Sequence, residues 1–94
     1  MSETPDPEIE VRDDEASSRY EIRVDGELAG FADYRLEGDR ITFPHTEVDP
    51  ARGGQGLGSR LIEFAVTDAR SRELEINPIC PFVRKWIEEN PAPS

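Results

Sequence analysis

The 94-residue sequence is short of several residue types on which whole classes of protein depend. Cys80 is its only cysteine, so the chain can form no intrachain disulfide and no metal site built from cysteines, and we expect no bound metal. No stretch approaches the roughly 20 apolar residues of a membrane-spanning helix. The opening MSETPDPEIE is acidic and lacks the basic and apolar regions of a signal peptide. These absences predict a cytoplasmic protein that does not bind membranes.

Positive charge is also scarce. Lysine and arginine together number 11 against 21 aspartates and glutamates, which gives a formal net charge of −10. Phosphate groups would be repelled at long range, so nucleic acid is not an expected partner. Lys85 is the only lysine, and a cationic site must therefore be built from particular arginines.

The length suits one small domain with a modest core. Residues 1–7 contain two prolines and acidic side chains, which is typical of a disordered tail. We expect the single domain to occupy residues 8–91 and a second short tail to occupy residues 92–94.

The first half of the domain has the pattern of β-strands. Residues 19–24 alternate apolar and charged side chains, and Asp25-Gly26 then favours a tight hairpin turn. Residues 27–36 and 40–48 continue as a second and a third strand, so the three form an antiparallel meander. Pro44 lies inside the third strand, where it implies a sheet edge or a bulge because proline donates no backbone hydrogen bond.

The second half changes to helical spacing. Apolar residues from Leu57 onward recur at helical intervals, which predicts an amphipathic helix ending near Arg72. Residues 73–76 are expected to form a short strand parallel to the third one, because a helix crosses over between them. Pro81 then opens a last helix. The fold class is therefore α+β, with layers built from the meander, the crossover helix, the parallel strand and the C-terminal helix.

The stretch ARGGQGLGSR, residues 51–60, places four glycines in six positions. Glycine is costly to order, so such a run needs a backbone reason. The dinucleotide fingerprint fails because Ser59 or Leu61 occupies its last glycine position, and the P-loop pattern fails because its lysine and hydroxyl positions hold Ser59 and Arg60. A loop that binds a pyrophosphate fits better, since a helix N-terminus offers free N–H groups to an anion. A plain turn that begins a helix is the alternative.

These residues also resemble a known family. TEVDPARGGQGLGSRLIEFAVTDAR resembles the acetyl-CoA motif of the GNAT superfamily of N-acetyltransferases, Q/R-x-x-G-x-G/A, with Gly56 and Gly58 in its two small positions and Gly53 where glutamine or arginine is usual. INPICPFVRKWIEENP resembles the short, stand-alone YjdJ-type branch. The resemblance covers about residues 8–91 and implies a minimal GNAT fold.

The resemblance implies acetyl-CoA as cofactor, with its pantetheine arm against the backbone of the third strand and its pyrophosphate in the glycine-rich loop. It also implies that the third strand and residues 73–76 splay apart to admit the cofactor. The cofactor-binding residues that follow are Thr46, Val48, Arg52, Gly53, Gly54, Gln55, Gly56, Leu57, Gly58, Ser59 and Arg60.

Three residues are candidates for the chemistry of acetyl transfer. Cys80 directly precedes Pro81, at the N-cap of the last helix, where the helix dipole lowers a thiol pKa; it is a candidate acid for the CoA thiolate or a nucleophile that forms an acetyl-cysteine. His45 and Glu47 are candidate bases, and they share a strand face with Ile41 and Phe43 if no bulge shifts the register. The alternatives are a core cysteine and two ordinary sheet residues.

The sequence thus predicts an acetyl-CoA-dependent N-acetyltransferase whose amine acceptor, a small molecule or a protein lysine, is unidentified. The alternative is a CoA-binding or protein-interaction module that keeps the fold without efficient turnover. We expect a monomer or a weak homodimer.

Overall fold

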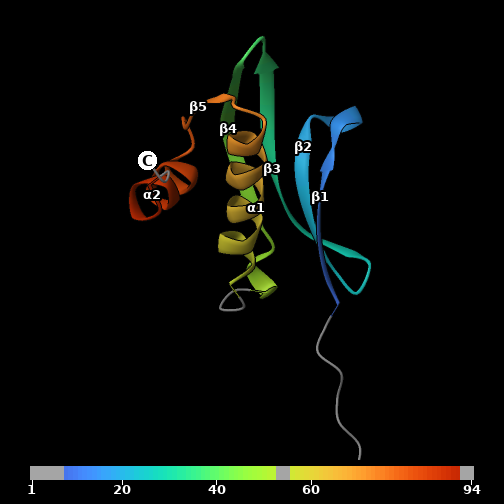
Figure 1. The fold of residues 1–94 in the computed structure, drawn as a ribbon. Helices are drawn as coiled ribbons and strands as arrows, with labels where there is room; N and C mark the ends of the chain where they lie inside the picture. Colours follow the sequence, from blue (N-terminus) through green and yellow to red (C-terminus); the bar gives the residue numbers. More distant parts are fainter. Residues whose placement is uncertain (1–7, 53–55, 92–94) are drawn as a thin grey trace, which may run out of the picture.

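The computed structural model describes residues 8–52 and 56–91 (Figure 1). Two short 3₁₀ turns, at Glu15–Ser17 and Pro50–Arg52, connect some of its elements. The strands and helices are β1 (Ile9–Asp14), β2 (Arg19–Val24), β3 (Glu27–Glu37), β4 (Arg40–Val48), α1 (Leu57–Ser71), β5 (Glu75–Asn77) and α2 (Pro81–Glu89). The α+β class and the expected order of elements are confirmed.

The strands form one mixed sheet in the order β1-β2-β3-β4-β5. The first four are antiparallel, and β5 runs parallel to β4 after the crossover through α1, as expected. Strand β5 begins two residues later than predicted, because Glu73 adopts a left-handed turn conformation with φ of 57°.

Strand β1 was not among the strands that the sequence pattern predicted. Ile9 and Val11 alternate with charged residues, but the acidic run that follows makes this segment resemble the tail before it. Its strand conformation comes from the sheet, because every residue from Ile9 to Asp14 is in register with β2.

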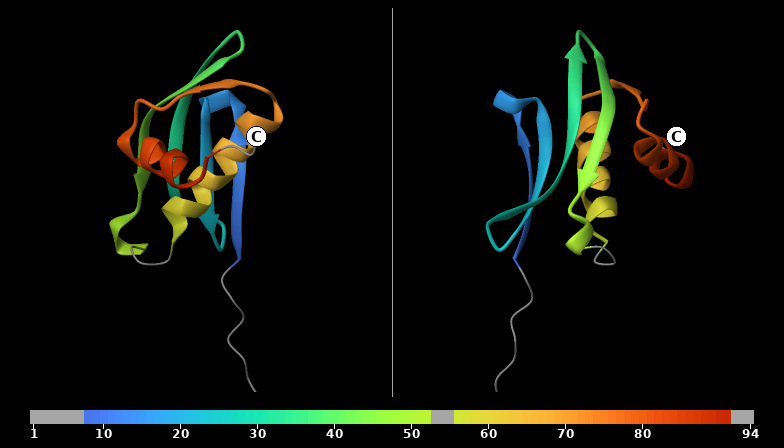
Figure 2. Two further views of the ribbon diagram at one scale, coloured as in Figure 1. Left: turned by 60° about the vertical axis from the view of Figure 1, so that its left-hand side comes forward. Right: turned by 180° about the vertical axis from the view of Figure 1, so that it is seen from behind.

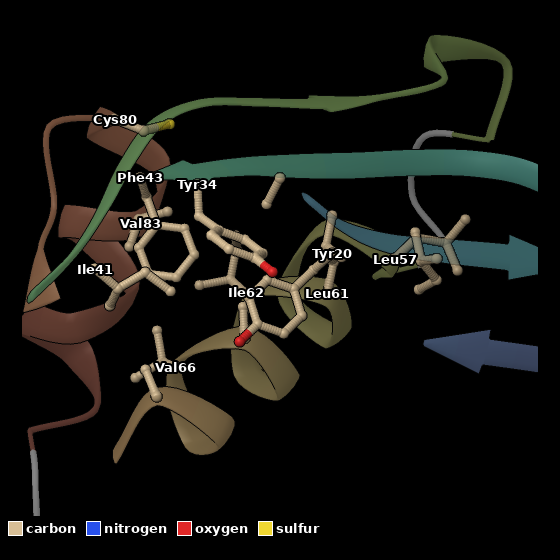
Figure 3. Close-up of a cluster of buried hydrophobic side chains, with 14 of the residues drawn as sticks. Tyr20, Tyr34, Ile41, Phe43, Leu57, Leu61, Ile62, Val66, Cys80 and Val83 are labelled. Carbon is tan, nitrogen blue, oxygen red and sulfur yellow. The ribbon is translucent and has the colours of Figure 1, made fainter. Parts of the chain in front are cut away.

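The core lies between one face of the sheet and the two helices, which Figure 2 shows in front of the strands in its left view. The buried residues of α1 interdigitate with aromatic side chains of β2, β3 and β4, and Tyr20 and Phe43 are fully buried there (Figure 3). Those α1 residues are Leu57, Leu61, Ile62, Ala65, Val66 and Ala69. Phe64, which belongs to the same predicted stripe, instead remains 39% exposed.

Strand β4 contains the irregularity that Pro44 predicted. Asp33 of β3 pairs with His45, whereas Arg35, two residues on, pairs with Thr42. Two residues of β4, Phe43 and Pro44, therefore lie opposite a single residue of β3, which defines a β-bulge. The bulge shifts the alternation of side chains in the second half of β4 by one position.

The sheet face that points away from the helices carries a buried carboxylate. The side chain of Glu21 is 1% exposed and contacts three arginines, with Arg19 at 2.7 Å, Arg23 at 3.1 Å and Arg12 at 3.6 Å. Burial alone would raise the pKa of Glu21, but hydrogen bonds from Arg19 and Arg23 outweigh it and hold that pKa below its usual value.

Candidate functional site

The candidate site is centred on the edge of β4 at the point where its pairing with β5 stops, which we call the opening. The two strands pair only from Arg40 to Thr42, opposite Glu75–Asn77. The Cys80 N–H still donates to the Phe43 carbonyl at 2.8 Å, and beyond this point β4 runs on to Val48 while the chain turns into α2. Within the described residues, the last part of β4 therefore has no strand beside it on this edge. All three residues of β5 pair with β4, so this edge is left by the end of β5, and the splaying that the resemblance implied stays a prediction.

The N-terminus of α1 points its backbone toward the end of β4. Its N-cap residue is Gly56, in a left-handed conformation with φ of 69°, and no side chain of the described residues caps the first turn. The first turn also contains no acidic residue, and Ser59 and Arg60 are exposed. Free N–H groups beside a cationic side chain form a suitable environment for an anion.

The glycine-rich loop is only partly described. Gly53, Gly54 and Gln55, which the resemblance assigns to the pyrophosphate, lie outside the described residues, and of Arg52 only the backbone position at the end of a 3₁₀ turn is given.

The packing of α1 against α2 by itself explains why residue 58 is a glycine. A Cβ atom there would lie 2.6 Å from Cζ of Phe82, so the ring would have to move. This close contact between α1 and α2 accounts for one glycine without any ligand. Phe82 itself is 46% exposed and is not a core residue.

Cys80 occupies the predicted N-cap position of α2. Its side chain is 6% exposed, at the margin of the apolar cluster beside β4 (Figure 3), and its thiol donates a hydrogen bond to Oγ1 of Thr46 at 3.5 Å. Burial raises the pKa of the Cys80 thiol. Hydrogen bonds to the thiolate outweigh burial and lower that pKa below its usual value, because the Thr46 hydroxyl can donate to the deprotonated sulfur, as can the backbone N–H groups of Val83 and Phe82.

His45 and Glu47 lie on the other face of β4. The bulge overturns the expectation that they share a face with Ile41 and Phe43, which are fully buried on the helix side. The two side chains are 56% and 64% exposed, and His45 Nε2 lies 3.4 Å from Oε2 of Glu47. The His45 ring also contacts Phe31 of β3, with 6.1 Å between ring centroids.

The structure therefore brings the predicted residues together in two groups, one on each face of β4. Cys80 and Thr46 form the inner group, and His45 and Glu47 form the outer group. Thr46 is predicted from the sequence to contribute only its backbone, and its hydroxyl is not among the predicted site groups. The signal that would have found it is the bulge at Pro44, because the shifted alternation turns Thr46 toward the helices.

Among residues 8–52 and 56–91, no three histidine, cysteine, aspartate or glutamate side chains gather as metal ligands. Neither described helix is long and apolar enough to cross a membrane.

Comparison with known proteins identifies the family. Residues 19–93 match the family model described as GCN5-related N-acetyl-transferase. The chain belongs to this family of N-acetyltransferases. Its placement in the short YjdJ-type branch stays a prediction.

Individual relatives agree with this assignment. The chain is 29% identical to human Protein NATD1 over 87 residues, which cover 90% of this chain and 77% of that protein. It is 38% identical over 71 residues to the streptothricin acetyltransferase of Streptomyces lavendulae, covering 71% of this chain and 38% of the enzyme.

Solved structures share the fold. The ribosomal-protein-alanine N-acetyltransferase of Brucella melitensis biovar Abortus 2308 matches with a TM-score of 0.61 and 25% identity, over 86% of this chain and 65% of that one. The N-acetylglutamate synthase of Neisseria gonorrhoeae, solved with coenzyme A and N-acetyl-glutamate, also gives 0.61, at 22% identity, over 78% of this chain and 18% of its own. The present chain thus spans less than two thirds of either solved chain.

Proposed function

We propose that this chain is an acetyl-CoA-dependent N-acetyltransferase, built as one domain over residues 8–91, that acts on an amine still to be identified. The observation that carries the proposal is the end of the β4–β5 pairing at Thr42, where β5 stops and β4 continues. It leaves an unpaired stretch of β4 backbone near the N-terminus of α1 and the acidic thiol of Cys80. Membership of the GCN5-related family supports the same activity.

The described residues fit the cofactor. The backbone of Thr46, Glu47 and Val48 has the free edge that an extended amide-containing arm requires, and the uncapped first turn of α1 suits a pyrophosphate. In this proposal Arg60, together with Arg52, supplies the positive charge, and residues 53–59 supply backbone N–H groups. The cofactor would bring an acetyl group activated as a thioester.

The side chains on the two faces of β4 suit two different roles in acetyl transfer, a base on one face and an acid on the other. His45 or Glu47, on the open face, would accept the proton that the amine loses as its nitrogen bonds to the acetyl carbon. Cys80, on the helix side, would donate its thiol proton to the sulfur that departs as the carbon–sulfur bond breaks. The proton held by the base then returns to Cys80 through solvent, which restores both groups.

Binding is tested by adding CoA to isotope-labelled protein and following the backbone amides by NMR. We expect selective shifts for residues 46–48 and 53–60, with little change in β1, at the opposite edge of the sheet. Saturating CoA that leaves those amides unmoved would show that the cofactor assignment is wrong.

Catalysis is tested separately, by measuring the release of free thiol from acetyl-CoA in the presence of small amines and lysine-containing peptides. We expect release above the buffer rate with at least one acceptor class. Intact CoA binding without release from a broad panel would favour the alternative, a CoA-binding module.

A further inference from the structure

Strand β1 forms an open edge of the sheet, at the end remote from the candidate site. Among the described residues it pairs only with β2, and the order of the sheet ends with it. Its six residues, IEVRDD, contain no proline, and the register from Ile9 to Asp14 has no bulge. A regular edge strand of this kind is a template for pairing with another strand unless something blocks it.

The backbone of β1 presents its polar groups in a definite order. The Glu8 carbonyl accepts a hydrogen bond from the Asp25 N–H at 2.8 Å, so the groups of Glu8 point toward the β2 side. In an antiparallel strand these groups alternate between the two edges. Those of Ile9, Val11 and Asp13 therefore point outward, to the open edge.

The side chains of β1 carry complementary charges at matching positions. Glu10 and Arg12 lie on the sheet face opposite to Ile9 and Val11, which pack toward the core. If a second copy pairs antiparallel with Val11 opposite Val11, Glu10 of each copy faces Arg12 of the other. The same register places the outward backbone groups opposite one another, and it sets Glu8 of each copy opposite Asp14 of the other. The two attractive pairs at the centre are thus flanked by two repulsive pairs at the ends, which keeps the contact weak.

Arg12 is available for such a contact. It is 53% exposed, and its 3.6 Å distance to Glu21 is the longest of the three arginine contacts to that carboxylate. Arg19 and Arg23 remain to hold Glu21 if Arg12 turns toward a partner strand.

The other face of β1 offers apolar surface at the same edge. A groove of about 540 Å³ separates β1 from α1, and Ile9, Val11 and the partly exposed Phe64 line it. In the proposed register Val11 of each copy meets its counterpart at the two-fold axis, which continues this apolar surface from one copy into the other.

We propose that two copies of this chain associate through antiparallel pairing of their β1 strands about a two-fold axis centred on Val11. The two sheets then join edge to edge, and the β4–β5 openings lie at the outer ends, where both stay accessible. The contact is independent of acetyl transfer. Because it is small, we expect a dissociation constant on the order of 10 to 100 µM.

The test is sedimentation of the full chain over concentrations from about 5 µM to about 1 mM, which bracket the expected constant. The mean mass should rise from 10.6 kDa toward twice that value. Glu10→Arg should weaken the dimer at least about tenfold, since two attractive pairs become repulsive. Glu88→Arg makes the same change of charge on α2 and should leave the dimer unaltered.

A complementation experiment tests the register. Arg12→Glu should also weaken self-association, but an equimolar mixture with Glu10→Arg should associate more strongly than either variant alone, because opposite charges then face each other in both pairs. Thermal unfolding checks that each variant is folded. If Arg12→Glu does not fold, the self-association of Glu10→Arg alone decides the test. A wild-type chain that stays monomeric throughout, or a Glu10→Arg dimer as tight as wild type, would overturn the proposal.

Discussion

At the scale of single residues, Cys80 combines a buried position with an acidic thiol. A cysteine that is 6% exposed in an apolar cluster would normally hold its proton more tightly than a free thiol. Thr46 and the first turn of α2 reverse this, because both stabilise the thiolate. The residue therefore contributes to packing and has the acidity that proton donation to a departing thiolate requires.

We predict that alkylation of Cys80 by iodoacetamide follows a titration whose midpoint lies below the value of about 8.5 for an ordinary thiol. The sign follows from the lowered pKa, since the reactive thiolate forms at lower pH. Thr46→Val should move the midpoint upward, and denaturant should return it to the ordinary value. The rate of alkylation against pH measures all three.

The same residue can be tested by activity. Cys80→Ser should retain the fold and CoA binding but lower turnover by about tenfold or more, because a serine hydroxyl is a far weaker acid. Full acetyl transfer by both Cys80→Ser and Cys80→Ala would show that Cys80 is only a core residue, and His45 or Glu47 would then carry the catalytic proposal.

At the scale of elements, the contact between α1 and α2 fixes the geometry of the opening. α2 buries only Val83 fully, and its Phe82 ring closes over the glycine in the first turn of α1. Both helices begin beside the last part of β4, so this contact sets the distance between the thiol at one N-cap and the free N–H groups at the other.

We predict opposite effects of Gly58→Ala in two backgrounds. In the wild-type chain the new methyl group collides with Phe82 and should lower stability by about 1 kcal/mol. In a Phe82→Ala background the same change should raise stability by up to about 1 kcal/mol, because alanine is the better helix former. Denaturant unfolding of the four proteins gives the coupling energy.

Thr67→Ala is the matched control, since Thr67 is exposed on the same helix and, unlike Ser59, does not line the surface hollow that contains Phe82. It should act alike in both backgrounds. An equal effect of Gly58→Ala in both backgrounds would contradict the proposed contact.

At the scale of the whole molecule, the charge is large for so small a domain. The formal net charge is −10 on 94 residues, so the acidic side chains repel one another in the folded state. On the sheet face away from the helices, the buried carboxylate of Glu21 is stabilised by its arginine partners. Screening by salt weakens the general repulsion between exposed charges more than it weakens a buried pair.

We therefore predict that salt stabilises the fold. Raising NaCl from about 20 mM to about 500 mM should raise the melting temperature by roughly 3 to 8 °C, the equivalent of about 1 kcal/mol in a domain of this size. KCl should act equally, because screening depends on ionic strength. A melting temperature that falls with salt would show that the ion pairs outweigh the net repulsion.

The sequence by itself determined the elements whose signals are local. The alternation in β2, β3 and β4, the turn at Asp25-Gly26, the helical spacing from Leu57 and the proline that opens α2 each rest on neighbours in the chain. The bulge at Pro44 and the N-cap position of Cys80 also followed, because proline and the residue before it have fixed backbone preferences.

The tertiary structure alone decided features that depend on contacts distant in sequence. β1 is a strand because β2 pairs with it, and Thr46 rather than His45 faces the thiol because of the register between β3 and β4. The absence of a side chain at Gly58 is explained by its close contact with the ring of Phe82, 24 positions later in the chain. Contacts of this kind cannot be predicted from local sequence patterns, because the energy of each contact depends on two residues that only the packed structure brings together.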